Sequence, residues 1–76
     1  MEDLLRYIVE GLIESTDEIT ITQRSGHHSI TLDLTVPAAE AGKVIGRTGR
    51  VVKSIRDVLG IVAARQNKRV HLEVNS

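Results

Sequence analysis

Cysteine, tryptophan and phenylalanine are absent from this 76-residue chain, and Tyr7 is its only aromatic residue. Without cysteine, neither a disulfide framework nor a thiolate zinc site can supplement the core. The shortage of aromatics argues against recognition by stacking of bases on aromatic platforms. No apolar run approaches the roughly 18 residues of a membrane span, and the acidic start Met1-Glu2-Asp3 is unlike a signal peptide. We therefore expect a cytoplasmic protein that does not contact membranes.

The short length bounds the architecture. We expect a single domain, residues 1–76. A domain of this size hides only about 60% of the surface that its unfolded chain exposes, so its stability margin is small.

The charges are balanced in number but not in position. Ten basic and ten acidic residues give a formal net charge of zero. Residues 1–23 carry six acids and one base, a net charge of −5, whereas residues 43–69 carry eight bases and one acid, a net charge of +7. Such asymmetry suggests an anionic partner for the second segment. Charge alone is equally compatible with a solvated dipolar surface.

The hydrophobic period changes along the chain. Apolar residues recur at helical spacing over 3–14 and 50–63, and an Ala-rich stretch over 38–45 predicts a shorter helix. Strict alternation predicts strands at 19–22, 30–36 and 70–74, the first two joined as a hairpin around Ser25-Gly26. The expected fold is α+β, in the order α-β-β-α-α-β. It comprises a mixed three-stranded sheet with three helices on one face, because a helical crossover places the last two strands parallel.

One motif carries chemistry. The glycines of Gly46-Arg47-Thr48-Gly49 lie between two predicted helices, and cations flank them at Lys43, Arg50 and Lys53. Glycine lets a phosphate approach the main chain closely, and the start of the following helix attracts anions. Arg47 can add a charge-assisted phosphate contact. A bare G-x-x-G also serves as a simple helix–helix turn, but such a turn requires none of these cations.

These residues carry a resemblance to a known family. Val44-Ile45-Gly46-Arg47-Thr48-Gly49-Arg50, set between two helices in this element order, resembles the KH domain of type II (bacterial) topology. The chain looks most like the small stand-alone bacterial KH proteins of the KhpA family, nearly from end to end. The resemblance implies single-stranded RNA binding, with Gly46, Arg47, Thr48 and Gly49 clamping the nucleotide backbone.

The same resemblance implies further contacts and partners. An apolar groove beside the clamp would hold a few bases, and its candidates are Val44, Ile45, Val52 and Ile55, which fit a pure core role equally well. The family implies self-pairing and pairing with a second KH protein of the Jag type. The expected function is a non-enzymatic, weakly sequence-selective RNA chaperone or post-transcriptional regulator. The alternative is an assembly subunit whose open sheet face or third helix, around Ile55 and Val58, forms a dimer surface.

The sequence gives no support for metal binding, for nucleotide binding through a Walker motif or for catalysis. His27 and His28 are adjacent, with no carboxylate at ligand spacing, so we expect no metal site. Gly42-Lys43 lacks the rest of a phosphate-binding Walker motif. No nucleophile–base or paired-carboxylate pattern is apparent, and we expect no enzymatic activity, cofactor or small-molecule substrate. Arg65, Lys68 and Arg69 either extend the RNA path or form a solvated helix end.

Overall fold

The computed structural model describes residues 1–76 and confirms the predicted element order. Short 3-10 turns precede β1, α2 and α3, at Thr16–Glu18, Ala38–Glu40 and Arg47–Gly49. The longest helix has 15 residues, and no helix has the length and apolar character that a membrane crossing requires. The helices and strands are α1 (Glu2–Glu10), β1 (Thr20–Ser25), β2 (Ser29–Thr35), α2 (Ala41–Ile45), α3 (Arg50–Ala64) and β3 (Arg69–Asn75).

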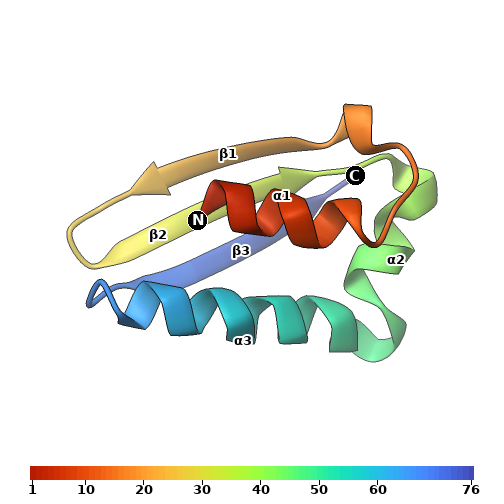
Figure 1. Ribbon diagram of the computed structural model, residues 1–76. Helices are drawn as coiled ribbons and strands as arrows, with labels where there is room; N and C mark the ends of the chain where they lie inside the picture. Colours follow the sequence, from red (N-terminus) through yellow and green to blue (C-terminus); the bar gives the residue numbers. More distant parts are fainter.

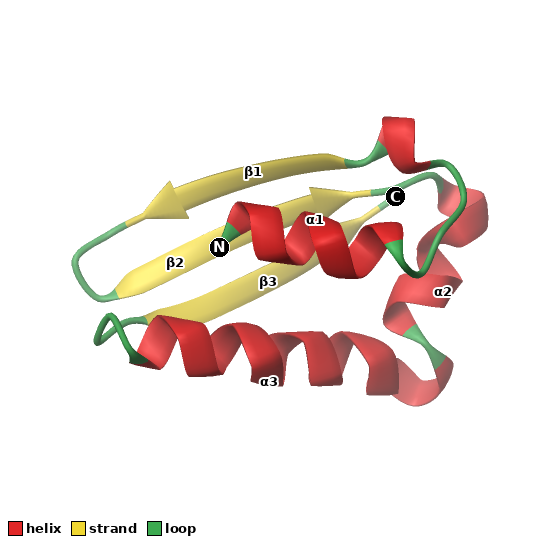
Figure 2. Cartoon of the chain, in the orientation of Figure 1, coloured by secondary structure: helices red, strands yellow, loops and turns green.

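The three strands form the predicted mixed sheet in the order β1-β2-β3. β1 runs antiparallel to β2, with Thr20 opposite Thr35, and β2 runs parallel to β3, with Leu32 opposite Leu72. Helices α1 and α3 lie side by side over one face of this sheet, and α2 stands at the end where β2 and β3 finish (Figure 1). Two of the three strands are edges, so β2 alone is paired on both sides (Figure 2).

The core lies between the sheet and the helices. In β2, Ile30, Leu32 and Leu34 are buried while the alternating Thr31 and Asp33 are only half-buried, as a sheet with one covered face requires. The other face of the sheet is open and polar, and there Arg24 pairs with Asp33 at 3.0 Å. Fifteen of the sixteen buried residues are hydrophobic, and the exception is Glu40.

The first helix ends earlier than its hydrophobic period predicts. The pattern indicates a helix over 3–14, but α1 ends at Glu10, and Gly11 closes it with an N–H bond to Ile8 O of 3.1 Å. Ile13 is nevertheless buried, so the chain reaches the core from a turn rather than from a further helical turn. The amides of Glu14 and Ser15 have a distant partner in place of a helical carbonyl.

That partner is the carboxylate of Glu40, which is only 8% exposed. Glu14 N–H donates to Oε1 at 2.8 Å and Ser15 N–H donates to Oε2 at 3.0 Å, while the Lys43 ammonium lies 3.5 Å from Oε1. A buried carboxylate is tolerated only when hydrogen bonds and countercharge replace its hydration. Glu40 therefore ties the connection between α1 and β1 to the start of α2.

These contacts change the acidity of Glu40. The hydrogen bond from the Glu14 amide is the main cause that lowers the pKa of Glu40 from 4.5 to about 2; burial opposes it, and the Ser15 amide and Lys43 assist it. Because the folded pKa lies below the unfolded one, the stabilisation is complete above about pH 4.5 and is lost as the pH falls toward 2.

We predict that Glu40→Gln lowers the midpoint of urea unfolding at pH 6, because the amide cannot accept from both backbone N–H groups. The deficit relative to the wild type should shrink at pH 3, where the wild-type carboxylate has lost part of its advantage. Glu18→Gln, which removes an exposed carboxylate nearby, is the control and should change little. An equal deficit for Glu40→Gln at both pH values would contradict this account.

Candidate nucleic-acid interface

The segment between α2 and α3 is a sharp turn in which three of four residues have positive φ angles. Gly46 has φ 76° and ψ 176°, Thr48 has φ 55° and ψ 26°, and Gly49 has φ 76° and ψ 15°. The helices are therefore two separate elements, and the glycines are not absorbed into one continuous helix. Gly46 N–H donates to Gly42 O at 2.8 Å and Gly49 N–H to Gly46 O at 3.3 Å, which closes the turn.

The two glycines are required for different reasons. A Cβ on Gly46 would collide with the side chain of Val51 and would lie 2.9 Å from Val51 N. A Cβ on Gly49 would meet nothing closer than Val52 Cγ1, at 4.0 Å. Gly46 is thus needed for both its φ and the close approach of α3, whereas Gly49 is needed only for its left-handed backbone.

Thr48 is a β-branched residue in a left-handed conformation, which is a genuine outlier. Its hydroxyl donates to Arg47 O at 2.6 Å. Such backbone strain, of order 1–3 kcal/mol, is typical of functional sites where the surroundings enforce the geometry. Arg47 and Thr48 together form the exposed tip of the turn.

The turn leads directly into the start of α3. No side chain caps this end of the helix, and its first turn contains no acidic residue. The amides of Arg47 and Thr48 take no part in the hydrogen bonds that close the turn. Exposed amides next to the positive end of a helix dipole form a favourable environment for an anion such as a phosphate.

The four cations in and beside the turn differ in whether they already form an ion pair within the protein. Lys43 is paired with Glu40 at 3.5 Å, and Lys53 is paired with Asp57 at 3.3 Å. Arg47 and Arg50 are exposed and form no ion pair. The two arginines can therefore meet a phosphate without first giving up an internal partner.

Of the four apolar residues proposed for a base-binding groove, three are core. Val44 is fully buried, and Val52 and Ile55 are 8% and 4% exposed. Val44 is the one buried residue of α2 and belongs to the hydrophobic core, which accounts for its presence without RNA. Its role as an RNA contact stays a prediction. Ile45 is 38% exposed and stays available beside the turn.

Comparison with known proteins assigns the chain to a family. A family model described as KhpA/KhpB, KH domain matches residues 2–74. This chain belongs to the KhpA/KhpB KH-domain family. "RNA-binding protein KhpA" of Chlamydia caviae is 42% identical over 74 residues, which cover 97% of this chain and 95% of that protein. Proteins of the same name from Borreliella burgdorferi and Clostridium acetobutylicum are each 40% identical, over 95% and 97% of this chain and 88% and 99% of their own lengths. No solved structure matches the chain.

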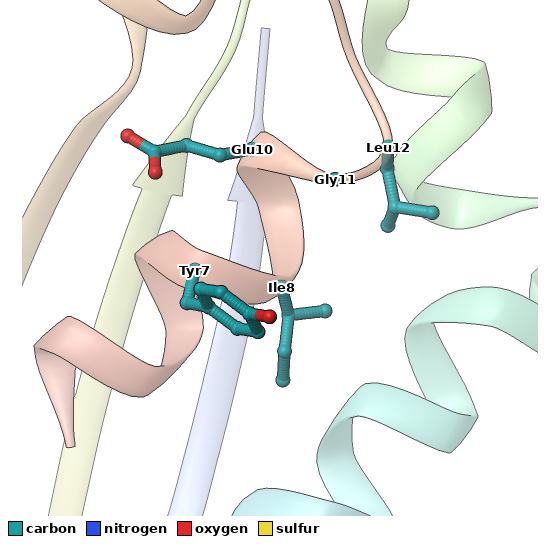
Figure 3. Close-up of a pocket in the computed structure, with 5 residues that line it drawn as sticks. All are labelled: Tyr7, Ile8, Glu10, Gly11 and Leu12. Carbon is teal, nitrogen blue, oxygen red and sulfur yellow. The ribbon is translucent and has the colours of Figure 1, made fainter.

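A second surface of this KhpA/KhpB-family chain is apolar and lies between α1 and α3. The shallow groove there is lined by Ile8, Leu12, Val51, Ser54, Ile55 and Val58. Figure 3 shows Ile8 and Leu12 directed toward α3, while Glu10 points away from it. The same two helices carry exposed large apolar side chains: Tyr7 on α1 is 76% exposed, and Ile61 and Val58 on α3 are 64% and 45% exposed.

Sequence reasoning overlooked three residues that the structure makes prominent. Ile61 lies off the apolar stripe of α3, and that deviation from the helical period is the signal that could have identified an exposed apolar residue. Arg56 donates from Nη2 to Leu72 O at 3.2 Å, capping a carbonyl of the edge strand β3. Neither this contact nor the anchoring role of Glu40 has a local signal, because each joins segments far apart in the chain.

We predict that alanine at the two glycines has unequal costs. Gly46→Ala should destabilise the fold by about 2–5 kcal/mol, because strain at positive φ adds to overpacking against Val51. Gly49→Ala should lower the free energy of unfolding by about 1–2 kcal/mol, because it adds only the strain of a left-handed backbone conformation. Urea unfolding followed by circular dichroism measures both, and equal costs would show that Val51 does not constrain the turn.

Proposed function

We propose that this protein is a non-enzymatic, cytoplasmic RNA-binding module that grips single-stranded RNA by its backbone with little base selectivity. Its role in the cell would be that of an RNA chaperone or post-transcriptional regulator. The relatives named RNA-binding protein KhpA, at 40–42% identity over most of the chain, support RNA as the ligand.

The observation that carries the proposal is the exposed turn Gly46–Gly49 with its free arginines. Bare amides, the uncapped start of α3 and two unpaired guanidinium groups converge at one end of the molecule. Phosphate is the ligand that this combination suits best. The shortage of aromatic residues fits the same view, because a grip on the backbone requires no stacking platform.

We predict that Arg47→Asp combined with Thr48→Asp removes RNA binding and leaves the fold intact. Both side chains are exposed, so the circular dichroism spectrum and melting should be nearly unchanged. If the wild type neutralises about four phosphates, the slope of log K against log salt should be about −3 for a single strand. Fluorescence anisotropy with a labelled RNA measures both quantities.

The control for this experiment is Arg24→Asp. It makes the same exchange of a guanidinium for a carboxylate on the open sheet face, far from the turn. The control should bind RNA nearly as the wild type does. Wild-type affinity in the double variant would refute the grip by the turn.

A second candidate function is assembly, with a second copy or with a KH protein of the Jag type. The apolar groove between α1 and α3 favours it, together with the exposed apolar side chains that these two helices carry, Tyr7 on α1 and Val58 and Ile61 on α3. A small module also gains stability and avidity by pairing, so assembly and RNA binding are compatible.

We predict that the wild type is a dimer by size-exclusion chromatography with light scattering, and that Ile61→Glu makes it a monomer. Burying the new carboxylate in an apolar contact would be costly. Ala64→Glu, at another exposed position on α3, is the control and should leave the dimer intact. A wild type that is monomeric at all concentrations would argue against assembly through this face, and a dimer indifferent to RNA would favour assembly over RNA binding.

A further inference from the structure

The end of the molecule opposite the Gly46–Gly49 turn is also cationic. Helix α3 begins at the turn and runs along the molecule to the connection with β3 (Figure 1). Its 15 residues span about 22 Å. Arg65, Lys68 and Arg69 follow at its far end, and we refer to these three residues as the distal cations.

The connection that presents the distal cations is a closed, defined turn. Asn67 adopts a left-handed φ of 58°, and its N–H donates to Ala64 O at 3.0 Å, while Lys68 N–H donates to Ala63 O at 3.0 Å. This pair of bonds is the Schellman arrangement at a helix end. Arg69 N–H donates to His28 O at 2.9 Å, which fastens the connection to the β1–β2 hairpin. The backbone that carries these cations is therefore held at both sides.

No carboxylate balances this charge. Residues 58–72 and the hairpin segment 19–32 contain no acidic residue. None of the distal cations forms an ion pair, whereas Arg24, Lys43 and Lys53 all do. Like charges clustered without partners raise the local potential and favour a polyanion at that surface.

The side of α3 between the two cationic ends is open. Lys53 and Arg56 are exposed one turn apart, and a Cβ at Gly60 would meet no atom within 4 Å. An RNA strand that leaves the turn would pass the Lys53–Asp57 ion pair and Arg56, and then the small residue Gly60. The roughly 22 Å length of α3 corresponds to about six stacked nucleotides at 3.4 Å each. A G-x-x-G clamp alone holds about four.

We propose that the distal cations bind the phosphate backbone of the same RNA strand that the Gly46–Gly49 turn holds, so that the binding surface extends along the whole of α3. This inference rests on the proposed RNA-binding function. It gives the protein two phosphate contacts at opposite ends of one rigid helix, and it makes affinity depend on the length of the RNA.

The test compares Arg69→Gln with Arg24→Gln, using a 4-nucleotide and a 12-nucleotide RNA of the same base. Both residues are exposed arginines on sheet strands and both changes remove one charge, but Arg24 lies on β1, the edge farthest from β3, and is already paired with Asp33. A double variant, Arg65→Gln with Arg69→Gln, amplifies the effect. Fluorescence anisotropy measures the 12-mer, and NMR titration measures the weakly bound 4-mer.

The double variant should bind the 12-mer about five- to twentyfold more weakly than the wild type, with a salt slope smaller in magnitude by about 1.4. It should bind the 4-mer unchanged, and Arg24→Gln should bind both RNAs as the wild type does. A longer RNA binds more tightly for statistical reasons alone, because it offers the clamp more positions. The comparison between variants, and not the comparison between RNA lengths, therefore decides the question. Wild-type affinity of the double variant for the 12-mer overturns the extended surface while leaving the clamp intact. If wild-type protein binds neither RNA, the proposed function itself fails.

Discussion

The close contact between Gly46 and Val51 is the constraint on which the candidate site depends. A five-residue helix cannot hold a direction by itself, and α2 is positioned by its burial of Val44 and by Glu40 at its start. The chain must then reverse into α3 with its backbone almost touching the side chain of Val51. Only glycine allows this, and the reversal is what exposes the tip of the turn instead of burying it.

The same geometry explains how a chain without net charge can present a cationic surface. Six of the ten acidic residues lie within residues 1–23, whereas two others, Glu40 and Asp57, pair with Lys43 and Lys53. The arginines at the turn are left unpaired. Segregation of charge along the sequence therefore becomes segregation in space, because α1 and α3 occupy different parts of the helical layer (Figure 1).

Much of the fold follows from local patterns, whereas the details of the site do not. Alternation in 30–36 and helical spacing in 50–63 predicted β2 and α3, since burial on one face sets both periods. The end of α1 was missed because Glu40, 26 residues from Glu14, takes over the hydrogen bonds that would extend the helix. The turn could be located from its glycines and arginines, but periodicity could not show that Val44 is core and Ile61 exposed.

The central claim is that RNA meets the backbone of the turn itself. An NMR titration of the isotope-labelled protein with a short single-stranded RNA tests it most directly. The account predicts that the largest amide shifts fall on Arg47, Thr48, Gly49 and Arg50, next to one another at the start of α3. Shifts confined to the α1–α3 groove around Ile8 and Val58, or to the open face of the sheet, would contradict it.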